Sequence, residues 1–227
     1  MIMAVFAAVA MLSSCSDGGK YVQRGDTICY TYWTFSFGRL YDTLPEVRPE
    51  SFQTVNDWLG HDGTHVYFKG KLVRARVDIP SLKAKKYPLF CDQNDYYYED
   101  APIHVADVSS YKIIKWCDEN VWAKDSRYAY FDTVRIEADI ATFEMKGWNT
   151  AVDKNHVYRY GKILPLADPA TYVEDWKGLY SRDKSHIWYC GELLEDVDYA
   201  TFDVDKEGVA SDKNGKFHGA ERITDEE

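Results

Sequence analysis

One stretch of the chain decides the fold, because much of the sequence repeats it. It reads Asp153-Lys154-Asn155-His156-Val157-Tyr158-Arg159-Tyr160-Gly161-Lys162-Ile163-Leu164 and continues with Asp168-Pro169-Ala170-Thr171-Tyr172. Its first residue, which we call the turn aspartate, recurs at intervals of 28 to 33 residues, at Asp62, Asp92, Asp125, Asp153, Asp183 and Asp212. A steady period of this length is typical of an array of structural repeats.

A second aspartate recurs with the same period. Each copy is followed by a Ser or Thr and then by a large apolar residue, and the copies are Asp78, Asp107, Asp139, Asp168 and Asp198. An aspartate carboxylate can accept hydrogen bonds from backbone amides two or three residues later, and Pro169 suits the first position of a helix. We therefore predict that these five residues are the caps of short helical turns.

The residues after each turn aspartate predict a β-hairpin. Asp and Asn favour turns, and an aromatic side chain always follows five residues after the turn aspartate. An aliphatic residue lies eleven residues after it wherever that position can be scored. The predicted fold class is all-β: tandem repeats of about 30 residues built from short β-hairpin strands, each with a short capped helical turn. No single unit can bury its apolar side alone, but stacked neighbours can.

The repeated Asp-Lys-Asn and Asp-Lys-Ser segments resemble a known family. Asp153-Lys-Asn-His-Val-Tyr158, Asp183-Lys-Ser-His-Ile-Trp-Tyr189 and Asp212-Lys-Asn214 are similar to the DKNYY-repeat family of bacterial proteins. The resemblance is strongest from about Val152 to Lys216 and weakens towards the N-terminus. It implies a repeat protein of unknown function, and it brings no catalytic residues with it.

The N-terminal residues predict export. Residues 1–14 are mostly apolar and carry no charge, as in a signal sequence. Leu12-Ser13-Ser14-Cys15 resembles a bacterial lipoprotein signal, in which cleavage leaves a lipid on Cys15. A plain secretory signal with an incidental cysteine is the alternative. We expect an exported protein, lipid-anchored in a bacterial membrane at the outer membrane or the periplasmic side, with residues 15–20 as a flexible tether.

The remaining chain is predicted to be a single repeat array over residues 21–227. Its units lie near 21–55, 56–86, 87–117, 118–147, 148–178 and 179–207, with a partial unit at 208–227. The first unit is degenerate and the last is polar, as expected of end units that close an array.

No motif in the sequence indicates catalysis or a cofactor. His65, His156 and His186 all lie three residues after a turn aspartate, where other copies carry Asp, Tyr or Gly, so we interpret them as turn residues. The segment at Asp212 lacks the closing acidic residue that a calcium loop needs. Cys29, Cys91, Cys117 and Cys190 are too scattered for a zinc site, although an exported chain could pair them in disulfides. We expect no metal, no cofactor and no enzyme.

Composition adds one exclusion. The net charge of −10 repels nucleic acid and anionic lipid headgroups, so we expect no nucleic-acid partner. The first functional hypothesis is a non-catalytic, lipid-anchored envelope protein whose repeats form a binding or spacer surface for a protein or glycan partner. The alternative is a glycan-binding module that uses exposed Tyr and Trp rings, and an enzyme is the remote alternative. Exposed, coplanar rings would favour the glycan hypothesis, whereas buried rings would favour the scaffold.

Overall fold

The structure is a computed structural model that describes residues 18–44, 46–174 and 179–223. These residues form many small antiparallel sheets, and this confirms the all-β repeat fold. The predicted signal sequence and Cys15 lie outside the described residues. In the described part of the chain, the single helix is a 3₁₀ helix, η1 (Ile79–Ser81).

The chain divides into two compact units, residues 1–84 and residues 85–227, which are described separately. The first unit contains two sheets and, after them, η1 and β8 (Lys83–Ala84). Its three-stranded sheet consists of β1 (Lys20–Arg24), β2 (Thr27–Thr34) and β3 (Gly38–Leu44). Its four-stranded sheet consists of β4 (Gln53–Thr54), β5 (Leu59–His61), β6 (Val66–Phe68) and β7 (Lys71–Leu72).

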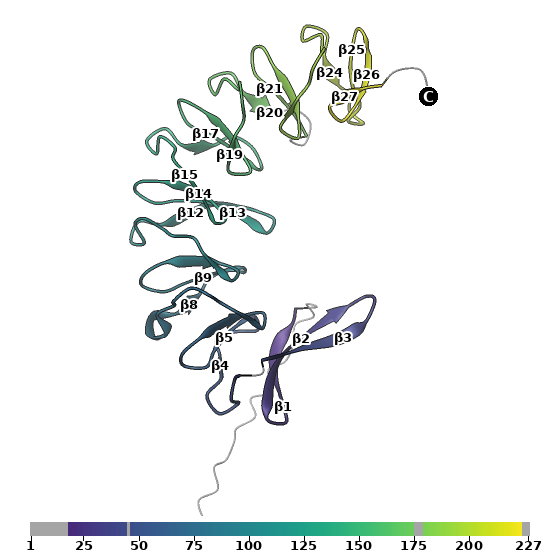
Figure 1. Ribbon diagram of the computed structural model, residues 1–227. Helices are drawn as coiled ribbons and strands as arrows, with labels where there is room; N and C mark the ends of the chain where they lie inside the picture. The colour runs from purple at the N-terminus through teal and green to yellow at the C-terminus, as the bar shows by residue number, and fades with distance from the viewer. Residues whose placement is uncertain (1–17, 45, 175–178, 224–227) are drawn as a thin grey trace, which may run out of the picture. The chain divides into compact units, whose positions relative to one another are not determined.

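The second unit contains one small sheet after another along the chain (Figure 1). It begins with β9 (Leu89–Cys91), β10 (Tyr96–Tyr98) and β11 (Ala101–Pro102). The next sheet consists of β12 (Lys112–Cys117), β13 (Asn120–Lys124), β14 (Ala129–Phe131) and β15 (Val134–Ile136). The sheet after it consists of β16 (Glu144–Met145), β17 (Thr150–Val152), β18 (Val157–Arg159) and β19 (Lys162–Ile163). A further sheet consists of β20 (Val173–Glu174), β21 (Tyr180–Arg182), β22 (Ile187–Tyr189) and β23 (Glu192–Leu193). The last sheet consists of β24 (Asp203–Val204), β25 (Ala210–Asp212), β26 (Gly215–His218) and β27 (Glu221–Arg222).

The glycines after the repeat aromatics form tight hairpin turns. In the β18–β19 hairpin, Arg159 pairs with Lys162, so Tyr160 and Gly161 make a two-residue loop, and both have a positive φ, 48° and 73°. Two consecutive positive φ angles define the type I′ turn that matches the twist of paired strands. The β22–β23 hairpin turns in the same way at Cys190 and Gly191.

The core repeats with the sequence. The aromatic ring five residues after each turn aspartate is buried in all six copies: Tyr67, Tyr97, Tyr130, Tyr158, Trp188 and Phe217. The aliphatic residue eleven positions after the turn aspartate is buried in five copies, at Val73, Ile103, Ile136, Leu164 and Leu194, and exposed in the last copy, at Ile223. In the second unit, the large residue after the second aspartate joins the same clusters, as Tyr111, Phe143, Tyr172 and Phe202.

Neighbouring sheets of the second unit pack closely where these turns lie. A Cβ atom added to Gly161 would lie 2.7 Å from the Cβ of Phe131, which belongs to the preceding sheet. A Cβ added to Gly219 would lie 3.2 Å from the ring of Tyr189, again one sheet earlier. Glycine is therefore needed at position 161 twice over, for its positive φ and for the close approach.

Two details of the predicted unit differ from the structure. A helical turn was expected in every unit, yet within the described ranges only η1 qualifies, and the other copies form hydrogen-bonded turns such as Thr171 N to Asp168 O at 3.2 Å. Among the described residues, six of the seven sheets also have four strands, more than a single hairpin supplies. Many of the outer strands are two residues long, such as β16 and β19, too short to show an alternating pattern in the sequence. The single array over residues 21–227 stays a prediction.

Candidate functional site

The residues that define the repeat converge on one carboxylate in each unit. In the copy at Asp153, Oδ1 accepts hydrogen bonds from the backbone amides of Asn155 and His156, both at 2.7 Å. Oδ2 accepts from the hydroxyl of Tyr158 at 2.9 Å and from the backbone amide of Asp139 at 2.7 Å. This buried carboxylate therefore closes its own turn, fixes its own core tyrosine and holds the second aspartate that precedes it in the chain.

Other copies repeat this arrangement. Asp125 accepts from the amides of Arg127 and Tyr128, from the hydroxyl of Tyr130 and, through Oδ2, from the amide of Asp107 at 3.0 Å. In the remaining copies, each turn aspartate also accepts backbone amides of its own turn, and these residues are Asp62, Asp92, Asp183 and Asp212.

In the last copy the core ring carries no hydroxyl, and an arginine side chain binds the turn aspartate instead. Asp212 precedes Phe217, and the guanidinium of Arg222 donates to both of its carboxylate oxygens at 2.6 and 2.7 Å. The same guanidinium lies 4.5 Å from the centroid of the Phe217 ring. Asp183 precedes Trp188, and there His186 Nδ1 lies 3.4 Å from Oδ2. The carboxylate remains the fixed element, while its donors vary.

The second aspartates form a smaller network at the surface. Asp139 Oδ1 accepts from the amide and the hydroxyl of Thr142, and its Oδ2 pairs with the ammonium of Lys154 at 2.7 Å. The amide of Lys154 in turn donates to the Thr142 hydroxyl at 3.0 Å. Equivalent ion pairs join Asp168 to Lys184 and Asp198 to Lys213. In the copy at Asp107, which has no lysine, the hydroxyl of Ser126 donates to the carboxylate.

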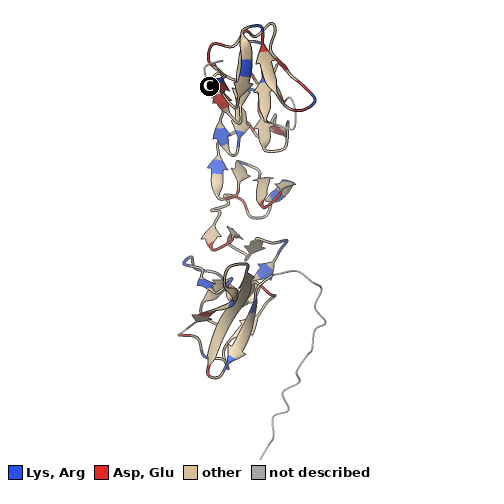
Figure 2. Cartoon of the chain, turned by 90° about the vertical axis from the view of Figure 1, so that its right-hand side faces the viewer, with Lys and Arg blue, Asp and Glu red and all other residues tan. Residues whose placement is uncertain are grey.

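Four of the five second aspartates, which were predicted to be helix caps, bond to backbone amides of a turn. Asp107, Asp139, Asp168 and Asp198 each accept a backbone amide two or three residues later, at 3.0 to 3.2 Å. These amides belong to turns rather than helices. Asp78 precedes η1, and among the described residues its side chain makes no capping bond to that helix. Figure 2 shows acidic residues mainly in the loops that connect the strands.

The electrostatics keep Asp153 ionised near neutral pH. Burial alone would raise the pKa of Asp153, but the amides of Asp139, Asn155 and His156 and the hydroxyl of Tyr158 together lower it below the usual value. The pKa of the Tyr158 hydroxyl rises, first because the ring is buried and second because the hydroxyl donates to Asp153. A group with this pattern is a fixed acceptor rather than a proton carrier near neutral pH.

The histidines and cysteines do not assemble a reactive centre. His65 and His186 each lie beside the aspartate of their own turn, and Gly63 donates its amide to His61 Nδ1 at 3.2 Å. Across residues 18–44, 46–174 and 179–223, no three His, Cys, Asp or Glu side chains gather to hold a metal ion. Of the thiols in these ranges, Cys29, Cys117 and Cys190 are free, and Cys91 is buried in β9.

A hollow of about 350 Å³ lies in the first unit, lined by Thr64, His65 and residues 72–77. Its lining contains Arg74 and Arg76 and no carboxylate. In the part of the chain that the structure describes, no helix is long and apolar enough to cross a membrane.

The repeated network explains what a family comparison detects. A sequence model of the DKNYY family matches residues 14–101 and again residues 89–190. The chain belongs to the DKNYY family. The match reaches further towards the N-terminus than the segments that carry the resemblance in the sequence. Comparison with curated proteins gave no match, and comparison with solved structures gave none. The DKNYY match therefore establishes a repeat family and names no activity.

Each kind of residue in the DKNYY motif has a structural role in this chain. The Asp is the buried acceptor, the Lys pairs with the preceding second aspartate, and the later aromatic residue fills the core. Sequence reasoning missed the role of the lysine and of Arg222. A usable signal existed for the lysine, because a second aspartate lies 15 or 16 residues before Lys154, Lys184 and Lys213.

Proposed function

We propose that this protein is a non-catalytic, lipid-anchored cell-envelope protein whose repeats serve as a binding or spacer surface. One observation carries the non-catalytic part. In the repeat around Asp153, the Asp153 carboxylate and the Thr142 hydroxyl accept backbone amides, and the Lys154 ammonium pairs with Asp139. A repeat whose defining side chains are engaged in this way is suited to building length and surface.

The lipid anchor rests on the sequence at Leu12-Ser13-Ser14-Cys15. Export by this route places the protein at the outer membrane or on the periplasmic side, within reach of protein or glycan partners of the envelope. No cofactor and no nucleic acid belongs to this proposal.

The burial of the repeat rings supports the scaffold over the glycan-binding alternative. Tyr97, Tyr130, Tyr158 and Trp188 are at most 2% exposed, so they are not available to stack on a sugar. Glycan binding would have to use other rings, of which Trp148 and Tyr160 are exposed in the second unit.

Two measurements test the proposal. Metabolic labelling with a fatty acid should mark the full chain, and Cys15→Ala should abolish the label; a label that persists in this variant contradicts the anchor.

Cross-linking in intact cells from a photoreactive residue at the exposed Lys162, with buried Ala151 as the matched control position, should capture a distinct envelope component. A chain that turns over an envelope substrate, with loss of turnover on a point substitution, would contradict the non-catalytic part.

A further inference from the structure

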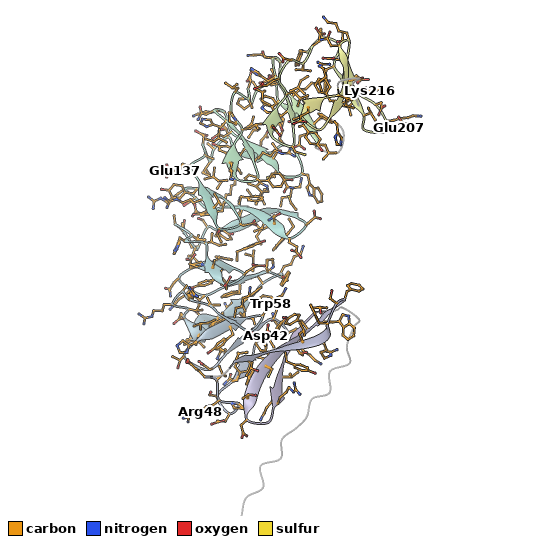
Figure 3. All side chains as sticks on the ribbon, turned by 45° about the vertical axis from the view of Figure 1, so that its right-hand side comes forward. Asp42, Arg48, Trp58, Glu137, Glu207 and Lys216 are labelled. Carbon is orange, nitrogen blue, oxygen red and sulfur yellow. The ribbon has the colours of Figure 1, made fainter. Side chains whose placement is uncertain are left out.

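The β2–β3 hairpin of the first unit ends in exposed aromatic rings. Its loop is Phe35-Ser36-Phe37, and the two phenylalanines are 105% and 79% exposed. Trp33, the next large residue on β2, is 54% exposed. Figure 3 shows side chains projecting past the end of this hairpin. Exposed aromatic residues gathered at one point mark a surface that is covered by something else.

The charged residues in the two rows behind this tip, on the face of Trp33, are Arg39 and Lys20. Trp33 pairs with Arg39 across the hairpin, and the next row on the same face of the sheet is Lys20, Thr31 and Tyr41. Arg24 lies over the ring of Tyr41 on this face, with its guanidinium carbon 4.2 Å from the ring centroid. These rows contain no acidic residue, although the whole chain carries a net charge of −10.

The rows are layered from the tip inwards. At about 3.3 Å per residue, Trp33 and Arg39 lie roughly 7 Å behind Phe35, and Lys20 lies roughly 13 Å behind it. An amphipathic segment at a bilayer surface buries its apolar side about 5–10 Å deep, with Trp and Tyr at the headgroups and Lys and Arg extending to the phosphates. From its tip inwards, the hairpin has the same order of residue types: Phe first, then Trp with Arg, and then Tyr with Lys.

The chain enters the first unit at the same end of the sheet. Lys20, the first residue of β1, pairs with Thr31, which is four residues from Phe35, whereas the β1–β2 turn lies at the other end. Cys15 is five residues before Lys20, a span of at most about 18 Å. A lipid on Cys15 would therefore hold the bilayer within reach of the hairpin tip.

We propose that the β2–β3 tip is a second membrane contact, in which Phe35 and Phe37 insert into the interface of an anionic lipid bilayer and Arg39 and Lys20 bind the headgroups. The choice of a bilayer rests on the convex tip, the cationic rows and the position of the chain entry. The last of these depends on the lipid anchor proposed above. A convex tip with protruding rings fits a deformable apolar layer without the pocket that a protein partner would have to provide.

Vesicle binding of the processed chain without its lipid, residues 16–227, tests the tip separately from the anchor. Sedimentation should show binding to phosphatidylethanolamine vesicles that contain phosphatidylglycerol and weaker binding to phosphatidylcholine vesicles. The double variant Phe35→Ser/Phe37→Ser should lose roughly tenfold or more in affinity. Arg39→Gln should lose about fivefold and only on the anionic vesicles. Trp148→Ser, which removes an exposed ring from the second unit, should bind as the unmodified chain does.

A probe at the tip gives an independent measurement. An environment-sensitive dye on Ser36→Cys, in a Cys190→Ser background, should shift its emission to the blue on anionic vesicles, whereas the same dye on Glu50→Cys should not. Absence of vesicle binding, equal binding by the double variant, or an equal loss in Trp148→Ser would overturn the proposal. Fatty-acid labelling at Cys15 is a separate result. If the chain is labelled but residues 16–227 do not bind vesicles, the lipid anchor is supported and the membrane contact of the tip is contradicted. If the chain is not labelled but residues 16–227 bind vesicles through the tip, the membrane contact is supported and the lipid anchor is contradicted.

Discussion

The carboxylate of Asp153 lies 2.7 Å from the backbone amide of Asp139, fourteen residues earlier in the chain. The same carboxylate closes its own turn and accepts the hydroxyl of Tyr158. The equivalent distance between Asp212 and the amide of Asp198 is also 2.7 Å, and between Asp183 and Asp168 it is 2.8 Å. In these repeats, one aspartate side chain therefore connects a hairpin to the turn that precedes it.

Replacing Asp153 with Asn should be the costliest polar substitution in its repeat. The variant keeps the shape of the side chain but removes the charge and turns one acceptor towards the Asp139 amide into a donor. Because a buried donor without a partner costs about 1–3 kcal/mol and several bonds change together, we expect a loss of about 3 kcal/mol or more. Urea melts measure it. Asp139→Asn, at the surface, should lower the midpoint much less, and an equal effect of the two variants would contradict this account.

Tyr158→Phe tests the hydroxyl contact alone. The ring stays in the core, and the hydroxyl loses its hydrogen bond to Asp153 and its 3.4 Å contact with His156 Nδ1, so the free energy of unfolding should fall by about 1.5–3 kcal/mol. Tyr160→Phe is the matched control, because Tyr160 is exposed in the adjoining turn. Equal stability of the two variants would mean that the Tyr158 hydroxyl contributes nothing.

Gly161→Ala tests the close packing of successive sheets. Alanine at a positive φ costs about 1–2 kcal/mol, and at Gly161 the added Cβ would also meet the Cβ of Phe131 at 2.7 Å, which adds about 1–3 kcal/mol. Gly63→Ala is the control, since Gly63 has a φ of 90° and open space where its Cβ would lie. Thermal melts should show the larger loss at Gly161. A larger loss at Gly63 would contradict the packing.

Stability should depend on pH in two separate ranges. The pKa values of Asp125 and Asp153 are lowered in the folded state, since amide and hydroxyl donors outweigh burial, so their contribution is present above about pH 4 and is lost as pH falls through the lowered values. The pKa values of Tyr130 and Tyr158 are raised by burial and by their aspartates, so their contribution is present below about pH 10 and is lost as pH rises further.

Urea melts at constant ionic strength should therefore show a plateau between these ranges, with declines on both sides. The Tyr158→Phe variant should have a shallower alkaline decline. Stability that rises steadily as pH falls from 7 to 3 would contradict the assignment of ionised aspartates.

Part of this structure can be predicted from the sequence, since the repeat places similar residues at similar distances. The turn aspartates, the aromatic residue five positions later and the aliphatic residue at Leu164 and its equivalents together indicate hairpins with a shared core. The ion pair of Lys154 with Asp139 cannot be deduced from a turn propensity, because it depends on how one hairpin lies against the preceding turn. The repeat period also does not predict three other features. These are the two-residue strands, the bond from Arg222 to Asp212 in place of a tyrosine hydroxyl, and the exposure of Phe35.

Native-state hydrogen exchange measures directly whether a turn aspartate of the second unit holds the backbone of the turn before it. In the unmodified chain, the amides of Asp139 and Asp198 should both be protected, by Asp153 and Asp212 respectively. In Asp153→Asn, we predict that the amides of Asp139, Asn155 and His156 exchange faster, whereas those of Asp198 and Asn214 keep their protection. Unchanged protection of Asp139 in this variant would contradict the account.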